Sequence, residues 1–271
     1  MDETLLLLLT AALGIVVGWA ITVPVHRYKE QRPMSPRDIA AEVGSADHPA
    51  PVIRATYREA RCPSCHHCYR GRDVPPVLSW FRGCPECGTS LPFTVPLVQV
   101  GVPVAMVLTT MALGETWVVL PYLFFVAVLA AISTIDLRIW LIPYWMPWAG
   151  TAIGLALIGA VSIGIGEPGS ILTAVGGAVA AFVFFFVLFL AAPGKLGFGD
   201  VRLSLLLGLF LSWLNPMLLV YGLLFGSLAG LAMGVAAVIA RKGSRFPFGP
   251  GLAVGALLAV WFSQPILGTL G

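Results

Sequence analysis

The sequence predicts an all-α membrane protein with about eight transmembrane helices. Only 11% of the 271 residues are charged, whereas an ordinary soluble domain carries about 25%. The mean hydropathy is +0.90. The apolar residues also fall into separate runs, most of them long enough to cross a bilayer. A soluble fold would have to bury all of these runs in one core, which excludes that class.

The expected spans follow one another along the chain with one long polar interruption. They cover 5–25, 96–114, 117–135, 143–165, 170–192, 201–214, 216–240 and 250–269. The run at 201–214 is short for a span, as a helix beside a polar site can be. We therefore expect a first transmembrane helix (1–25), a polar loop (26–95) and a membrane-embedded domain (96–271). Whether 31–60 within the loop is ordered stays open.

The basic residues predict which helix ends face the cytoplasm. All 16 Lys and Arg lie in the polar loop, in the connections after the third, fifth and seventh spans, or just inside a neighbouring helix end. Lys and Arg mark cytoplasmic loops, so we expect a multi-pass protein of the bacterial inner membrane with its N-terminus outside. Asp2 and Glu3 precede the first run, unlike the basic start of a cleaved signal. The apolar runs make the lipid membrane an expected partner. Nucleic acid is not an expected partner, because the sequence has no dense basic tract.

Two aspartates stand at matching helix ends on the predicted cytoplasmic side. Asp136 ends the run at 117–135, and Asp200 precedes the run at 201–214. Two adjacent carboxylates share one proton. The ionised member can then deprotonate a water, and the protonated member can donate to a scissile carbonyl oxygen. The site would therefore be built for aspartyl protease chemistry.

Other uses of the aspartates remain open at this point. An aspartate at a helix end can cap the helix or pair with a nearby base, here Arg138 or Arg202. Intramembrane carboxylates also serve proton- or cation-coupled transporters. A transport relay is expected near the bilayer midplane in a broken helix, whereas these aspartates are expected at helix ends.

Several motifs resemble those of one family, the bacterial type IV prepilin peptidases. Gly197–Asp200 reads Gly-Phe-Gly-Asp, the GxGD motif of intramembrane aspartyl peptidases. Asp136–Pro143 resembles the first catalytic motif of that family, and Phe246–Pro250 resembles its late FGP motif. Pro75–Trp80 resembles a Pro-containing run that ends in Ser-Trp. The resemblance covers nearly the whole chain in order, except for the insert at 31–60.

The resemblance implies an aspartyl endopeptidase that cuts the short basic leader from prepilins or pseudopilins at the cytoplasmic membrane face. Asp136 and Asp200 would be its catalytic pair, and Gly197 and Gly199 would shape the loop that carries Asp200. Many members also N-methylate the new terminus, using S-adenosylmethionine as the methyl donor. That cofactor is expected here only if the chain transfers methyl groups.

Four positions depart from the family's motifs. Thr22 replaces an Asn, and Gln99 replaces a Glu, both in the N-terminal region associated with methylation. Tyr144 stands where an acidic or amide residue is frequent, and Arg202 stands where Lys is usual. The resemblance therefore predicts peptidase activity more firmly than methyl transfer.

The cysteines predict a structural zinc site in the polar loop. Cys62-Pro-Ser-Cys65 and Cys84-Pro-Glu-Cys87 are two CxxC pairs with 18 residues between them. This is the spacing of a four-cysteine zinc ribbon, in which each pair supplies two thiolates to tetrahedral zinc. Cysteines in a cytoplasmic loop are expected to stay reduced. Cys68 is a spare thiol or an alternative to Cys65.

Overall fold

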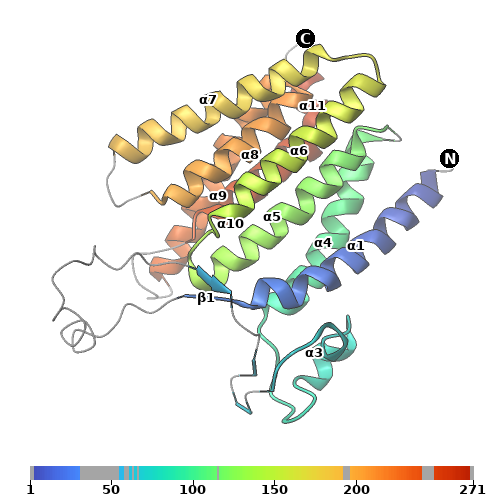
Figure 1. Cartoon of the computed structure of the whole chain (residues 1–271), viewed down its shortest axis with the longest axis vertical. Helices are drawn as coiled ribbons and strands as arrows, with labels where there is room; N and C mark the ends of the chain where they lie inside the picture. Colours follow the sequence, from blue (N-terminus) through green and yellow to red (C-terminus); the bar gives the residue numbers. More distant parts are fainter. Residues whose placement is uncertain are drawn as a thin grey trace.

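A computed structural model gives the fold of most of the chain (Figure 1). It describes residues 3–30, 55–57, 61–62, 64–65, 67–114, 116–191, 196–239 and 247–268. Most of the polar insert at 31–60, residues 192–195 and Phe246 lie outside these ranges. Predictions for those residues are therefore not tested by the structure.

Long helices dominate the described part of the chain, which confirms the predicted all-α membrane class. They are α1 (Glu3–His26), α4 (Thr94–Leu113), α5 (Val119–Ile139), α6 (Trp145–Gly164), α7 (Gly169–Ala191), α8 (Phe198–Leu214), α9 (Pro216–Ile239) and α10 (Gly249–Trp261). Among the described residues, six of these helices are long and apolar enough to cross a membrane, whereas α8 has 17 residues and α10 has 13.

Shorter elements complete the fold. They are β1 (Tyr28–Glu30), β2 (Ala55–Tyr57), η1 (Gly71–Asp73), α3 (Leu78–Arg82) and α11 (Ser263–Gly268). The strands β1 and β2 pair antiparallel, with Tyr28 opposite Tyr57. This small sheet was not expected, because three-residue strands are too short to show an alternating pattern.

Three predicted spans differ from the helices by more than two residues at an end or by an interruption. The helix α5 ends at Ile139, four residues beyond the predicted 135, so that Asp136 lies inside its last turn. The helix α8 begins at Phe198, three residues before the predicted 201, because Gly199 and Asp200 adopt helical conformation. The single span predicted at 250–269 is divided by a turn at Phe262 into α10 and α11. Pro265 follows this turn, and a proline has no N–H with which to continue a helix.

The helices alternate in direction. The helix ends that carry or adjoin the two aspartates therefore lie on one side of the bundle. The ends of α1 and α5 and the starts of α4, α8 and α10 share this side (Figure 1). The cysteine-bearing segment between α1 and α4 lies on it as well. Both aspartates are therefore at the same end of the molecule as the cysteines.

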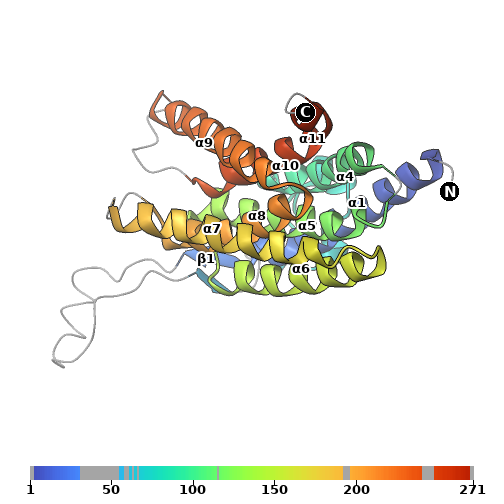
Figure 2. The ribbon, with the colours of Figure 1, turned by 90° about the horizontal axis from the view of Figure 1, so that it is seen from above.

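The bundle is assembled largely from closely packed helix pairs: α1 with α4, α7 with α8, and α9 with α10 (Figure 2). Small residues make this closeness possible. Gly208 of α8 packs against the backbone of Gly177 and Ala178 in α7, and Gly255 of α10 packs against the backbone of Gly226 in α9. Such contacts between glycines are typical of membrane helices, where small residues let backbones approach.

An aromatic core sits between α5 and α8. The rings of Phe125 and Phe210 stack with centroids 4.4 Å apart, and Tyr122 stacks on Trp213 at 5.8 Å. The Tyr122 hydroxyl donates a hydrogen bond of 2.6 Å to the Phe210 carbonyl oxygen. A buried hydroxyl needs such a partner. This core fixes α5 relative to α8, the two helices that carry the aspartates.

Candidate active site

The two aspartates are buried at the same end of the bundle. Asp136 lies in the last turn of α5 and is 5% exposed, and Asp200 lies in the first turn of α8 and is 8% exposed. Ile142 links their surroundings, because added Cβ atoms on Gly249, which bonds Asp136, and on Gly199, which precedes Asp200, would lie 3.4 and 3.0 Å from its carbons. Two buried carboxylates in neighbouring positions can share one proton and serve as an acid–base pair. Their place at helix ends does not suit a relay at the midplane.

Two glycine-containing turns position the two aspartates. The N–H of Gly249, at the start of α10, donates a hydrogen bond of 3.0 Å to Oδ2 of Asp136. Gly197 is the N-cap of α8, and its carbonyl oxygen accepts from the N–H of Asp200 at 3.1 Å. A Cβ on Gly197 would lie 3.3 Å from Oδ2 of Asp200. Oδ2 of each carboxylate therefore lies beside a glycine, where the missing side chain leaves room for it.

The turn after α5 brings a third element to the site. Trp140 adopts a left-handed conformation with φ of 56°, and its N–H donates to the Asp136 carbonyl oxygen at 2.9 Å. This conformation costs a residue other than glycine about 1–2 kcal/mol. The turn lets Ile142 pack beside Gly199 and Gly249: added Cβ atoms there would lie 3.0 and 3.4 Å from Ile142 carbons.

Among the described residues, the aspartates do not serve as ion-pair partners of the nearby arginines. Neither Asp136 nor Asp200 forms an ion pair with a described base. Arg138 instead donates from Nη1 to the Val25 carbonyl oxygen at 2.9 Å. The guanidinium carbon of Arg202 lies 4.7 Å from the ring centroid of Phe198. A pair of buried carboxylates without such a base resembles a working site more than a structural one.

Gly249 and Ile142 lie at the site, although the sequence did not single them out as site residues. The signal was present, because Ile142 lies in the Ile-Pro of the first motif and Gly249 is the glycine of the late FGP motif. Only the folded chain shows that these two motifs meet.

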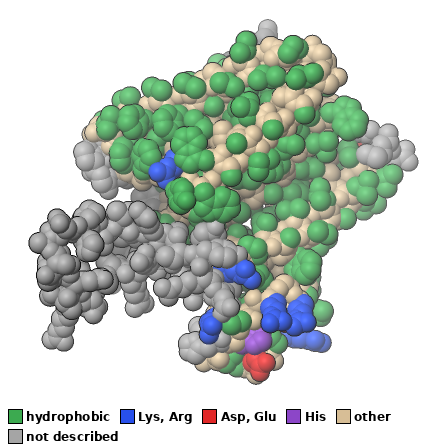
Figure 3. All heavy atoms as spheres, in the orientation of Figure 1, with side chains coloured by type: hydrophobic (Ala, Val, Ile, Leu, Met, Phe, Trp, Pro, Cys, Tyr) green, Lys and Arg blue, Asp and Glu red, His purple; other side chains and the backbone are tan. Residues whose placement is uncertain are grey.

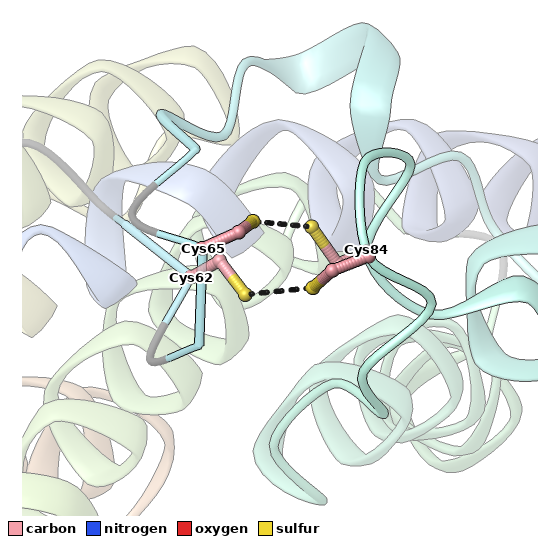
Figure 4. A group of neighbouring side chains, drawn as sticks. Cys62, Cys65 and Cys84 are labelled. Atoms are coloured by element: carbon pink, nitrogen blue, oxygen red, sulfur yellow. Dashed lines mark hydrogen bonds between the residues drawn. The ribbon is translucent and has the colours of Figure 1, made fainter.

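The four cysteines of the two CxxC pairs converge as the spacing predicts (Figure 4). Their sulfur atoms all lie within 4.8 Å of one another. Sγ of Cys62 is 3.6 Å from that of Cys87, and Sγ of Cys65 is 3.6 Å from that of Cys84. Tetrahedral zinc–sulfur bonds of about 2.3 Å would put the sulfurs about 3.8 Å apart. The cluster could therefore hold a metal ion, and Cys65 rather than Cys68 belongs to it.

The surroundings of Cys62 favour the thiolate that a metal binds. Hydrogen bonds from the backbone N–H groups of Cys65 and Ser64 lower the pKa of the Cys62 thiol to about 6. A knuckle whose N–H groups point at sulfur is suited to metal binding, because the ligand must be deprotonated. All four positions of a tetrahedral ion would be filled by sulfur, which leaves no open coordination site for catalysis.

The cysteine module, residues 61–93, is attached to the sides of α1 and α4. Gln99 of α4 accepts from Nε1 of Trp80 at 2.6 Å and donates to the Val74 carbonyl oxygen at 3.1 Å. Trp19 of α1 donates to the Gly71 carbonyl oxygen at 2.9 Å. A small apolar cluster around Val74 closes the contact. The polar residue at position 99 therefore has a structural task.

Two family descriptions match the sequence. Residues 123–235 match the type IV leader peptidase family, and residues 12–113 match the bacterial peptidase A24 N-terminal domain. The first match includes both aspartates, and the second includes all four clustered cysteines. No solved structure is significantly similar to the chain.

Individual relatives match nearly the whole chain. A prepilin leader peptidase/N-methyltransferase of Burkholderia pseudomallei is 31% identical, over 96% of this chain and 86% of the relative. One of Aeromonas hydrophila is 30% identical, over 93% and 89%. A type 4 prepilin-like proteins leader peptide-processing enzyme of Escherichia coli is 29% identical, over 92% and 91%.

Proposed function

The chain belongs to the type IV leader peptidase family, and from this membership we propose that Asp136 and Asp200 are the catalytic pair of a membrane aspartyl endopeptidase. The observation that carries the proposal is the burial of both carboxylates at one end of the bundle, where Gly249 beside Asp136 and Gly199 beside Asp200 both pack on Ile142. The proposed substrates are prepilins or pseudopilins. Their basic leader would lie along the cytoplasmic face, where their apolar helix enters the bilayer.

The proposed mechanism uses the pair as one acid–base unit. The ionised member takes a proton from a water, and the hydroxide attacks the scissile carbonyl carbon while the protonated member donates to the carbonyl oxygen. Collapse of the tetrahedral intermediate releases the leader and returns a proton to the new amine. The N–H of Gly249 holds Asp136 in place, and the Gly197 turn holds Asp200.

We also propose the division of the chain and its orientation. Residues 1–25 form the first transmembrane helix, 26–95 form a cytoplasmic loop with the metal module, and 96–271 form the peptidase domain. The N-terminus faces outside, so that the aspartates face the cytoplasm. The distribution of Lys and Arg supports this orientation.

Co-expression with a prepilin-like substrate tests the proposal. The substrate carries a short basic leader before an apolar helix, and we expect one cut, which shortens it by the leader. A matched substrate whose leader is moved away from the apolar helix should stay intact. The alternative function is a proton- or cation-coupled transporter that uses the two aspartates. An uncut substrate, together with proton uptake by vesicles that contain the chain, would favour that alternative.

Thr22 and Gln99, which depart from the family's motifs in the region associated with methylation, are buried and already hydrogen-bonded within the protein. The Thr22 hydroxyl donates to the Gly18 carbonyl oxygen at 2.6 Å, and the amide of Gln99 bonds Trp80 and Val74. We therefore derive no methyl-transfer step. The mass of the mature N-terminus in the same co-expression reports on it directly, and we expect an unmethylated product.

Zinc in the cysteine module is the second proposed component. We expect the purified full-length chain to carry about one zinc ion. Cys84→Ser removes a ligand from the cluster, so the variant should lose the metal and unfold at a lower temperature. Cys68→Ser changes a thiol outside the cluster and should keep the metal. Elemental analysis measures both variants, and a zinc-free wild type or equal zinc in both variants would contradict the site.

A further inference from the structure

The cysteine module exposes four large apolar side chains. Val77, Leu78 and Phe81, in and beside α3, are 51%, 52% and 85% exposed. Phe93, which is the N-cap of α4, is 72% exposed. We call these four residues the α3 face. An exposed group of large apolar residues indicates an interaction surface.

The rest of this segment is fixed, so the α3 face keeps its outward direction. Trp80 points inward to Gln99, and Ser79 is buried and donates to the Pro75 carbonyl oxygen at 2.7 Å. Val77 has a φ of 63°, and the N–H of Leu78 donates to the Pro76 carbonyl oxygen at 2.7 Å. This tight γ-turn is strained for a β-branched residue. Strain of this kind persists where the surrounding contacts enforce it.

The attachment points place the α3 face beside the transmembrane helices rather than beyond their ends. Trp19, which bonds Gly71, lies about two turns or about 10 Å before the end of α1 at His26. Gln99, which bonds Val74 and Trp80, lies more than one turn after the start of α4. The segment from η1 to α3 is therefore level with the last turns of helices that cross the membrane.

The α3 face continues the lipid-facing surface of α4. Leu97, Val100 and Val104 of α4 are 48%, 47% and 51% exposed. Together with Phe93 they follow one another at steps of three or four residues, so they share one side of the helix. Apolar side chains on the outside of a membrane helix contact lipid. Phe93, the last residue of the module, continues that surface into the module.

Basic residues accompany the apolar ones. Arg70, Arg72 and Arg82 of the module are exposed. In the space-filling view, Lys and Arg side chains gather where the module meets the helical body, and acidic side chains lie farther out (Figure 3). Arginines beside an apolar face match the anionic headgroups of a cytoplasmic leaflet.

We propose that the α3 face inserts into the interface of the bilayer, with Arg70, Arg72 and Arg82 bound to anionic phospholipid headgroups. The module is then held to the membrane as well as to α1 and α4. The occupant is the lipid itself, rather than substrate or a second copy of the chain. The proposal needs only the membrane-spanning helices and does not rest on peptidase activity.

Photo-crosslinking of the full-length protein tests the insertion. A benzophenone amino acid replaces Phe81, and the chain is reconstituted in vesicles of phosphatidylcholine and phosphatidylglycerol. Leu97 on α4 is the lipid-facing reference position. Glu86, whose side chain is 65% exposed, is the reference in the module outside the α3 face. Zinc content shows that the module is folded in each variant.

We expect a phospholipid adduct at positions 81 and 97 and none at position 86. An adduct at 81 with added substrate or with a second copy, in place of lipid, would overturn the proposal. Equal lipid adducts at 81 and 86 would do the same, because the contact would then be unspecific.

A second comparison tests the arginines. With the benzophenone at position 81, R72Q/R82Q should lower the ratio of phosphatidylglycerol to phosphatidylcholine adducts at least twofold. R138Q, a change of a base outside the module, should leave the ratio as it is. An unchanged ratio in R72Q/R82Q would overturn the headgroup part of the proposal.

Discussion

Replacing Asp136 with Asn, or Asp200 with Asn, is expected to lower the cleavage rate by about 10⁴-fold, the upper range for loss of a general acid or base. Asparagine has nearly the shape of aspartate, but it can neither take a proton from water nor hold one for the carbonyl oxygen. Both carboxylates are buried, so solvent has little access to replace the missing group. The fold should persist, because neither variant adds volume or a buried charge.

The double variant makes this prediction sharper. Since the two aspartates act as one unit, removing both should cost no more than removing either, as is typical of residues that share one catalytic step. Glu167→Gln is a matched control, because it neutralises an exposed carboxylate in the turn between α6 and α7. Its rate should equal that of the wild type. Initial rates on purified protein decide the matter, and a single variant that cuts at the wild-type rate would remove that aspartate from the proposed pair.

Much of the fold could be predicted from the sequence because the bilayer constrains it strongly. Apolar runs of about 20 residues must become helices, since no other open structure satisfies the backbone in lipid. The run at 201–214 was predicted as a span although it is short, because a helix beside a polar site can be short and because the positions of Lys and Arg fit eight spans. Its true start at Phe198 could not be predicted, because glycines such as Gly199 are usual in turns. The packing of Ile142 against Gly199 could not be predicted either, because it joins two segments that are far apart in the sequence.

The sequence predicted which side chains form the candidate sites. It did not predict which backbone groups lie against them. Two aspartates and four cysteines stand out because a charge is costly in a membrane and because CxxC pairs have few other uses. The role of Gly249 is different. Its function is a backbone N–H, which every residue except proline possesses, so residue type gives no warning. That a glycine is needed there follows from the distance to Asp136, which only the folded chain provides.

Gly249→Ala is expected to lower the turnover rate about 100-fold, the usual cost of displacing a catalytic group by about 1 Å. A Cβ at this position would lie 2.7 Å from Oδ2 of Asp136 and 3.4 Å from Cδ1 of Ile142. The carboxylate must then move, and its hydrogen bond from the Gly249 N–H lengthens. Substrate binding should change little, because Gly249 touches the catalytic carboxylate rather than the expected path of the leader.

Steady-state kinetics separate this effect from general instability. The control Gly176→Ala adds the same methyl group to α7 where nothing lies within 4 Å, and it should keep full turnover. We expect Gly249→Ala to lower kcat with KM and zinc content near those of the wild type. If kcat also stayed at the wild-type value, Asp136 would tolerate displacement, which a general acid or base does not. The position of Oδ2 against Gly249 would then have no part in catalysis, and the hydrogen bond that joins α10 to α5 would serve the fold alone.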